Sequence, residues 1–415
     1  MDQKRLALQS MKEVQIDYDK LKMDLKPYYP HDVLFEMMIP RELLKKNLGL
    51  KQVHKLVMQM ADSGLITRQE IVSMIPPILL DVDSDHAVLD MCAAPGSKTA
   101  QLLELIRASA MHDKGLSNQA PVKGFVVAND ADPKRAFMLT HQMNRLNTAN
   151  IMVTNHQAQE FPELRYKDCK VGEDRRVRYD RIVCDVPCSS DAAIRKIPTK
   201  WLKWNTKDSQ SLHPLQIQIL QRGIELLKVG GKITYSTCSL NVIENEAVVA
   251  AILKQYKGKI RLVPSEERLA GFQFQKGLTS WDFLNLKPKE QLGPIEEKRK
   301  SGDLSESFFD EYKSVDEVPQ DMRTHIRETM FMSNYSEEVL AELPKCLRVM
   351  PHIQNTSGFF ITCIEKIAEM DGDEPDLETE DKSDVKPPSV IQNDNRMKDF
   401  SYFRCDLSDP DVEYI

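Results

Sequence analysis

The sequence of 415 residues lacks the apolar segments that mark a membrane protein or a secreted protein. No run reaches the roughly 18 apolar residues that a helix needs to cross a bilayer. The charged start Met-Asp-Gln-Lys-Arg is not followed by the apolar core of a signal peptide. We therefore expect a soluble protein of the cell interior, with no membrane partner.

Signatures of nucleotide and metal binding are also missing. The P-loop spacing and the G-x-G-x-x-G fingerprint do not occur. The eight cysteines form no C-x-x-C pair, and no histidine lies at a spacing that would complete a zinc site. We therefore predict no metal, and reduced thiols that are mostly buried small apolar side chains. This prediction applies to Cys169, Cys184, Cys346 and Cys363.

An excess of one charge is confined to a single acidic segment. The formal net charge is −7, but Glu369–Asp384 alone has nine acidic residues and one lysine. Taking its −8 from the total of −7 leaves +1 for the rest of the chain. Net charge therefore does not indicate or exclude a nucleic-acid partner, and any RNA site must be a local patch.

Short apolar runs alternate along the chain with segments of helical spacing. We expect helices at Lys98–Arg107, Pro133–Leu146, His213–Lys228 and Glu244–Lys254. Strands are expected at Ala87–Leu89, Gly124–Asp130, Ile151–Asn155, Tyr179–Asp185 and Lys232–Thr237, with a hairpin at Leu347–Met350 and Phe359–Ile364. This alternation predicts an α/β fold with a seven-stranded, mostly parallel sheet whose last strand is antiparallel.

The same patterns divide the chain into four regions. Residues 1–80 are predicted to be a helical N-terminal segment, in which Leu34–Met60 has helical spacing and Pro76–Pro77 ends a further helix. The α/β domain is expected at 81–367, followed by an acidic disordered linker at 368–395. Residues 396–415 resume an apolar pattern, which we interpret as the start of a truncated further domain.

The first expected strand leads into a turn of small residues. Ala93, Ala94 and Gly96 have short side chains, so a bulky ligand can approach the backbone there. In open α/β sheets, ligands bind at this carboxyl end of the strands. Ser97 is expected to cap the helix that follows. Taken alone, this strand, turn and helix are a weak functional signal.

Two of the expected strands end in an aspartate, Asp130 and Asp185. A single aspartate at a strand end is more often a cap or a loop residue. Beside a turn of small residues, a carboxylate that binds both hydroxyls of a ribose is the better interpretation. The acids therefore favour a nucleoside-type cofactor.

Two cysteines lie just beyond the ends of neighbouring expected strands and outside the apolar runs. They are Cys188, in Asp185-Val-Pro-Cys-Ser-Ser-Asp191, and Cys238, in Ser236-Thr-Cys-Ser-Leu-Asn241. A single cysteine is usually buried filler, but a pair in adjacent carboxyl-end loops favours a nucleophilic role. Zinc binding is the alternative, and it lacks further ligands.

Four ordered motifs resemble the Sun-domain RNA cytosine-5 methyltransferases, and most of all the eukaryotic branch that acts on tRNA. They are Asp-Met-Cys-Ala-Ala-Pro-Gly-Ser-Lys-Thr, Ala-Asn-Asp-Ala-Asp-Pro-Lys-Arg, Cys-Asp-Val-Pro-Cys-Ser and Tyr-Ser-Thr-Cys-Ser-Leu-Asn. The similarity extends from about Tyr28 to Lys366. It implies a Rossmann-like class I methyltransferase fold, RNA and in particular tRNA as partner, and a monomer. It also implies a location in the nucleus or nucleolus, with the cytoplasm as the alternative.

The resemblance also assigns roles to residues. It implies that Cys238 is the nucleophile, that Cys188 helps to release the product, and that Asp185 and Lys98 position the target cytosine. S-adenosyl-L-methionine is implied as cofactor, held by Cys92, Ala93, Ala94, Pro95, Gly96, Ser97, Lys98, Asp130, Gln157 and Asp185. A thiolate suits this chemistry, because carbon 5 of cytosine becomes nucleophilic only after a nucleophile adds to carbon 6.

Four positions depart from the family pattern, one of which is Val242, where the family usually has proline. Gln157 stands where the family usually has aspartate, and Ser190 and Ala192 stand where it usually has glycine. The glycines would matter if those positions need positive φ. The alternative hypothesis is therefore a catalytically weak or inactive member that serves as an RNA- or protein-binding module.

Overall fold

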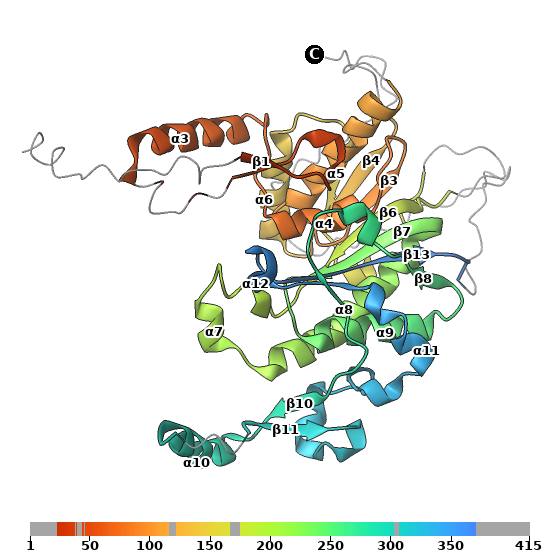
Figure 1. The fold of residues 1–415 in the computed structure, drawn as a ribbon. Coiled ribbons are helices and arrows are strands. Elements are labelled where there is room, and N and C mark those ends of the chain that lie inside the picture. Colours follow the sequence, from red (N-terminus) through yellow and green to blue (C-terminus); the bar gives the residue numbers. More distant parts are fainter. Residues whose placement is uncertain are drawn as a thin grey trace, which may run out of the picture. The chain divides into compact units, whose positions relative to one another are not determined.

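A mixed β-sheet of nine strands organises the protein (Figure 1). The computed structural model describes residues 23–115, 122–166, 175–302 and 307–370, apart from 38, 40–43 and 45. All described helices and strands belong to one unit, formed by 1–166 and 176–374. The predicted linker from residue 371 onward, the predicted start of a further domain and Cys169 lie outside the described residues.

The centre of the sheet is parallel and its last strands are antiparallel. In spatial order the parallel strands are β5 (Ile151–Thr154), β4 (Phe125–Asn129), β3 (Ala87–Asp90), β6 (Tyr179–Asp185) and β7 (Leu227–Thr237). Antiparallel strands complete it: β13 (Phe359–Lys366) beside β7, then β12 (Leu347–Val349) and β9 (Gln275–Lys276), with β8 (Ile260–Leu262) also on β13. The predicted α/β class, parallel core and final hairpin are confirmed.

The sheet has nine strands where the sequence predicts seven. The two additional strands, β8 and β9, contain three and two residues. Segments this short show no recognisable alternation of apolar and polar residues, so their pairing depends on the neighbouring strands. Both lie on the antiparallel side, and the order of the parallel strands is unaffected.

Helices cover both faces of the sheet (Figure 1). Successive strand residues point to opposite faces, so Leu89 and Val127 pack in one apolar cluster while Val88 and Val126 pack in another. The first cluster includes residues of α8 (Thr206–Leu226) and α9 (Glu246–Gln255). The opposite face is covered by α4 (Ile71–Leu79), α5 (Ser97–Ala108) and α6 (Pro133–Asn144).

The N-terminal region is not wholly helical, contrary to the prediction for 1–80. An antiparallel pair forms from β1 (Met23–Leu25) and β2 (Phe35–Met37), and helix α3 begins only at Leu48 and ends at Asp62. The apolar spacing over 34–60 is misleading because Pro40 interrupts it, and a residue before proline disfavours the helical region.

Two predictions about helix ends are also wrong. Helix α4 continues through Pro76 and Pro77 to Leu79, because both prolines are buried in the apolar packing of that helix. Ser97 does not cap α5. The cap residue is Gly96 at φ 109°, and Ser97 already belongs to the first helical turn.

Smaller elements complete the described chain. They are α7 (Thr199–Lys203), β10 (Phe283–Leu286), α10 (Lys289–Lys300), β11 (Phe309–Tyr312), α11 (Glu337–Leu340) and α12 (Pro351–Gln354). Strands β10 and β11 pair with each other as a separate hairpin. Among the described residues, no helix is both long and apolar enough to cross a bilayer.

We predict that Gly124→Ala destabilises the protein. A Cβ atom there would lie 2.5 Å from the carbonyl oxygen of Ser84 and 3.0 Å from that of His86, and backbone cannot move aside as a side chain can. The expected loss in free energy of unfolding is about 1–3 kcal/mol, measured by denaturant unfolding. Gly293→Ala in α10 is the control, since nothing lies within 4 Å of its added Cβ and stability should be unchanged or higher. Equal effects of the two substitutions would contradict the prediction.

Candidate active site

The residues that the sequence singles out gather at the carboxyl ends of the parallel strands. The turn after β3 carries Ala93 to Gly96, and Asp130 follows β4. Asp185 ends β6, and Cys238 directly follows β7. Because neighbouring parallel strands end at the same edge of the sheet, these separate segments build one site.

The small-residue turn after β3 is fixed by backbone hydrogen bonds. The N–H of Ala93 donates to the carbonyl oxygen of Asn129 at 2.7 Å, and the N–H of Gly96 donates to that of Ala93 at 2.8 Å. A Cβ at Gly96 would lie 2.8 Å from side-chain atoms of both Leu139 and Met143, so only glycine fits between the turn and α6 without displacement. The turn is therefore rigid, and the side chains of Ala93 and Ala94 are buried within it.

Asp130 is almost completely buried beside this turn, with 3% exposure. Its carboxylate accepts hydrogen bonds from the N–H groups of Ala94, at 3.1 Å, and Asp132, also at 3.1 Å. The guanidinium of Arg135 lies 3.4 Å away. Asp130 thus holds the turn in place, and its carboxylate oxygens keep further lone pairs for another donor.

Gln157 and Cys92 have different surroundings from Asp130. Gln157 is exposed just beyond β5, two residues after Asn155, whose amide donates to the carbonyl oxygen of Asp130 at 2.6 Å. Cys92 is partly buried, packs against the same apolar cluster as Leu89, and burial raises the pKa of its thiol. Gln157 can therefore contact a ligand with its side chain, whereas Cys92 contributes mainly through the backbone.

Lys98 and Asp185 form an ion pair between α5 and the end of β6. Nζ of Lys98 lies 2.6 Å from Oδ2 of Asp185, and the hydroxyl of Ser236 donates to Oδ1 at 2.7 Å. The lysine side chain is 10% exposed and that of the aspartate is 27% exposed. Nζ also lies 5.5 Å from the ring centroid of Phe359, within cation–π range. The pair is therefore held in one geometry and remains accessible from one side.

The two predicted nucleophile candidates touch each other. Sγ of Cys188 lies 3.3 Å from Sγ of Cys238, and the hydroxyl of Ser190 lies within 3.8 Å and 3.3 Å of the two sulfurs respectively. The Cys188 thiol hydrogen-bonds to Cys238 and lowers the pKa of Cys238 to about 7, with burial opposing and Ser190 assisting. The same contact raises the pKa of Cys188 well above its ordinary value. Of the two thiols, Cys238 is therefore the one that loses its proton more readily.

A buried carboxylate, which the sequence reading missed, joins the two cysteine loops. Glu244 is fully buried and accepts hydrogen bonds from the N–H and hydroxyl of Ser189 and from the hydroxyl of Ser239. The side-chain amide of Gln216 donates to it at 3.0 Å. Since Ser189 and Ser239 directly follow the two cysteines, Glu244 sets the distance between them.

A second buried acid fixes the end of the same loop. Glu246 forms a two-pronged ion pair with Arg348 of β12, with both N···O distances at 2.6 Å. The guanidinium also donates to the carbonyl oxygen of Leu240 at 2.9 Å. The acidic pair in Glu244-Asn-Glu246 was visible in the sequence, but an expected helix there gave no reason to assign it to the site.

Some of the remaining predictions about individual positions hold and one does not. Ser190 has φ 59°, so this position adopts the left-handed conformation that favours glycine. Ala192 does not, because it lies in a 3-10 turn (Asp191–Ala193) and is absent from the positive-φ residues. Cys184, Cys346 and Cys363 are buried, as predicted. In the part of the chain that the structure describes, no three His, Cys, Asp or Glu side chains form a metal-binding group.

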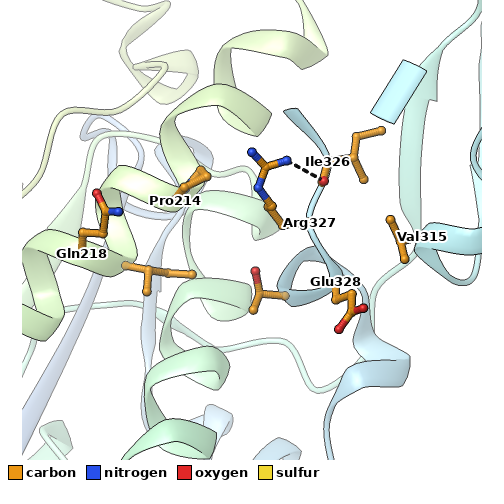
Figure 2. Close-up of a pocket in the computed structure, with 8 residues that line it drawn as sticks. Pro214, Gln218, Val315, Ile326, Arg327 and Glu328 are labelled. Carbon is orange, nitrogen blue, oxygen red and sulfur yellow. Dashed lines mark hydrogen bonds between the residues drawn. The ribbon is translucent and has the colours of Figure 1, made fainter. Parts of the chain in front are cut away.

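A cavity of about 530 Å³ lies outside this site, between α8 and the 3-10 turns that follow β11 (Figure 2). It is lined by Pro214, Ile217, Gln218, Val315, Ile326, Arg327, Glu328 and Thr329. None of the predicted site residues lines it. His213 binds the hydroxyl of Thr329 at 2.8 Å, and burial lowers the pKa of this histidine to about 4, so His213 is a neutral structural residue.

The strand order and the final antiparallel hairpin define a class I methyltransferase fold, with two thiols in contact at the carboxyl edge of the sheet. Residues 77–292 match the family model described as 16S rRNA methyltransferase RsmB/F. This range is more than half of the chain, and the chain belongs to that family. The resemblance inferred from the four motifs is thereby confirmed.

Two similar proteins are tRNA cytosine-C(5) methyltransferases of yeast and fly. The chain is 41% identical over 367 residues to the multisite-specific tRNA:(cytosine-C(5))-methyltransferase of Saccharomyces cerevisiae, covering 88% of this chain and 48% of that protein. It is 40% identical over 351 residues to the tRNA (cytosine(34)-C(5))-methyltransferase of Drosophila melanogaster, covering 85% and 43%. The chain thus spans about half the length of these relatives.

Among solved structures, one similar chain is a methyltransferase homolog protein from Pyrococcus horikoshii. It is 22% identical, with 88% of this chain and 81% of that chain covered and a TM-score of 0.49.

We predict that Asp90→Asn changes how stability depends on pH. Asp90 is fully buried, and burial raises the pKa of its carboxyl to about 7 from 3.8. Between these values the folded protein keeps a proton that the unfolded chain has lost, so stability falls as pH rises through this window. Asparagine has no such proton, and the hydroxyl of Thr99, 2.8 Å from Oδ2, still finds an acceptor.

The measurement is the melting temperature of variant and wild type at several pH values from about 4 to 8. The difference, variant minus wild type, should become more positive as pH rises. Asp316→Asn is the control, because its side chain is 92% exposed and should track the wild type. A difference for Asp90→Asn that is constant across the window would contradict the raised pKa.

Proposed function

We propose that this chain is the catalytic part of an S-adenosyl-L-methionine-dependent RNA cytosine-5 methyltransferase that acts on tRNA. The observation that carries the proposal is the contact between Cys188 and Cys238, 3.3 Å apart, with the pKa of Cys238 lowered to about 7. A thiolate at neutral pH is what addition to a pyrimidine ring requires. The names of the yeast and fly relatives support tRNA as the RNA.

Cys238 is the nucleophile in this proposal. Its thiolate adds to carbon 6 of cytosine, which makes carbon 5 electron-rich enough to attack the methyl group. A base then takes the proton from carbon 5, and the electrons of that C–H bond re-form the double bond between carbons 5 and 6 as the bond from Sγ to carbon 6 breaks, which restores the aromatic ring and frees the thiolate. Cys188 acts at this second stage. While Cys238 is charged, it raises the pKa of Cys188, and this effect ends once Cys238 is bonded to carbon 6 as a neutral thioether. Cys188 can then release its proton to solvent, and its thiolate accepts the proton from carbon 5.

The Lys98–Asp185 pair holds the cytosine ring. It lies close enough to Cys238 to affect the pKa of that thiol, so all three groups share one site. The addition of a thiolate to carbon 6 places negative charge on the cytosine ring, in part on the ring nitrogen N3. A proton donor fixed in advance beside N3 stabilises this charge without reorganising solvent.

The residues at the edge of the sheet fit S-adenosyl-L-methionine. The carboxylate of Asp130 suits ribose hydroxyls, the exposed amide of Gln157 suits the adenine amine, and the small residues from Ala93 to Gly96 have no long side chains that would obstruct the rest. Lys98 and Asp185 complete the set beside the cytosine. When bound, the cofactor supplies a methyl group on a positively charged sulfur.

The alternative is a weak or inactive member of the family that binds RNA or a protein. Ser190 at positive φ supports it, because a side chain there strains a position suited to glycine. The lowered pKa of Cys238 favours the enzyme, since a binding module has no use for a thiolate. Trapping on RNA that contains 5-azacytosine separates the two, because only the enzyme forms a covalent adduct. A nuclear or nucleolar location and a monomeric state remain part of the proposal.

We predict separable effects of the two cysteines. Cys238→Ala should give neither methylated tRNA nor an adduct, because no bond to carbon 6 can form. Cys188→Ala should allow addition and methyl transfer but slow elimination, which leaves protein attached to RNA through Cys238. A denaturing gel with labelled tRNA reads this as a slow band.

The controls for this experiment are the double variant, which should lose the band, and tRNA with a non-cytosine base at the target, which should never give it. If Cys188→Ala yields no band while wild type methylates, the assignment of the two roles is wrong. If wild type neither methylates tRNA nor is trapped on 5-azacytosine RNA, the binding-module alternative replaces the enzyme.

We also predict that Gln157→Asp tightens cofactor binding. A carboxylate accepts a hydrogen bond from the adenine amine about 1 kcal/mol more strongly than an amide does, which is about fivefold in Kd. Calorimetry with S-adenosylhomocysteine measures the change. Gln320→Asp adds the same charge at an exposed position in another part of the chain and should have no effect. Unchanged or weaker binding to Gln157→Asp would remove Gln157 from the adenine site.

A further inference from the structure

Ser190 combines an unfavourable backbone with a central position. It follows Cys188 by two residues and has φ 59° and ψ 32°. The other non-glycine residues at positive φ in the described chain are histidine, aspartate or asparagine, the types that tolerate this conformation best. Serine tolerates this conformation less well, so we expect a contact of its hydroxyl that offsets the backbone strain.

The hydroxyl of Ser190 lies between the two thiols. Its Oγ is 3.3 Å from Sγ of Cys238 and 3.8 Å from Sγ of Cys188. The left-handed backbone is what turns the side chain toward the sulfurs. A hydroxyl can accept a hydrogen bond from a thiol and, once the thiol has lost its proton, donate one to the thiolate.

The other hydroxyls near the cysteines are engaged elsewhere. Those of Ser189 and Ser239 both donate to the carboxylate of Glu244, and the hydroxyl of Ser236 donates to Asp185. The remaining contact of Ser190 Oγ is a long one, 3.4 Å, to the carbonyl oxygen of Cys188. Of these hydroxyls, that of Ser190 is therefore the one placed to donate a hydrogen bond to the Cys238 thiolate.

We propose that Ser190 is a catalytic residue that stabilises the Cys238 thiolate by donating a hydrogen bond from its hydroxyl. It acts together with the Cys188 thiol, so that two donors hold one negative sulfur. The proposal rests on the proposed function of Cys238 as nucleophile. In this proposal, serine in place of glycine adds a hydrogen-bond donor to the site. The sequence alone suggests that the same replacement weakens activity.

The charge balance of the site supports this role. The pKa of Cys238 is lowered first by the Cys188 thiol, then by Ser190 and by the charge of Lys98, against burial and the charge of Asp185. A buried thiolate without donors would be protonated at neutral pH. With the Ser190 hydroxyl as second donor, Sγ of Cys238 keeps one hydrogen bond if the Cys188 thiol turns away during elimination.

The test measures the ionisation of Cys238 in the free protein, with neither RNA nor cofactor present. Full-length protein is alkylated with iodoacetamide at a series of pH values, and mass spectrometry follows the peptides of Cys238 and Cys188 separately. In Ser190→Ala and Ser190→Gly, we expect the midpoint of Cys238 alkylation to rise by about half a pH unit or more. This corresponds to an about threefold slower alkylation at pH 6.

The two variants separate the hydroxyl from the backbone. Both remove the hydroxyl, but glycine relieves the strain of positive φ and alanine keeps it. An equal shift in both variants supports the proposal, whereas no shift, or a shift in alanine alone, overturns it. Ser211→Ala, on the exposed side of α8, is the control and should match the wild type. If Ser190→Ala fails to fold, Ser190→Gly still tests the hydroxyl, because glycine adopts positive φ without strain.

A second measurement connects the thiol to the reaction. Adduct formation with 5-azacytosine RNA should slow by the same factor in both variants at pH 6 and recover at about pH 8.5, where the thiolate forms without help. A rate loss that persists at high pH would overturn the proposal, because a structural defect does not titrate. Absence of any adduct in the wild type would count against the proposed function alone, since the alkylation profiles are measured without RNA.

Discussion

The carboxylate of Glu244 is the constraint on which the site depends. It lies buried between two loops that belong to different strands, and it accepts hydrogen bonds from both. A buried charge without donors costs several kcal/mol, so each donor must keep its place for the fold to be stable. Ser189 and Ser239 are therefore fixed, and with them the neighbouring Cys188 and Cys238. The short distance between the thiols follows from this arrangement.

The strands of the sheet fix the side chains around Glu244. The parallel pairing of β6 with β7 aligns Asp185 with Ser236, whose hydroxyl bonds the same carboxylate that Lys98 reaches from α5. The antiparallel hairpin then adds Arg348, which ties Glu246 to the carbonyl oxygen of Leu240. The charged side chains of this region are each ion-paired or hydrogen-bonded, which is what their burial requires.

The sequence predicted the parts of the fold that depend on local pattern. Apolar runs such as Tyr179–Asp185 and helices such as Pro133–Asn144 are visible because their periodicity is complete within the segment. The pair β1–β2 was missed because each of its strands has only three residues. The short strands β8 and β9 were missed because their existence depends on partners far away in the sequence. The same holds in the site. Motifs identified Cys188 and Cys238, but the roles of Glu244 and the Ser190 hydroxyl arise from contacts about 50 residues apart in sequence.

The late position of β13 in the chain has a consequence for synthesis on the ribosome. In the finished sheet β7 lies between β6 and β13, and β13 ends only at Lys366. Until that segment has emerged, β7 is an edge strand with unpaired backbone groups, and Arg348 has not reached Leu240. A nascent chain that already contains both cysteines therefore lacks the support that holds Leu240, next to the Cys238 loop. The contact between Arg348 and Leu240 can therefore form only after translation has passed the hairpin.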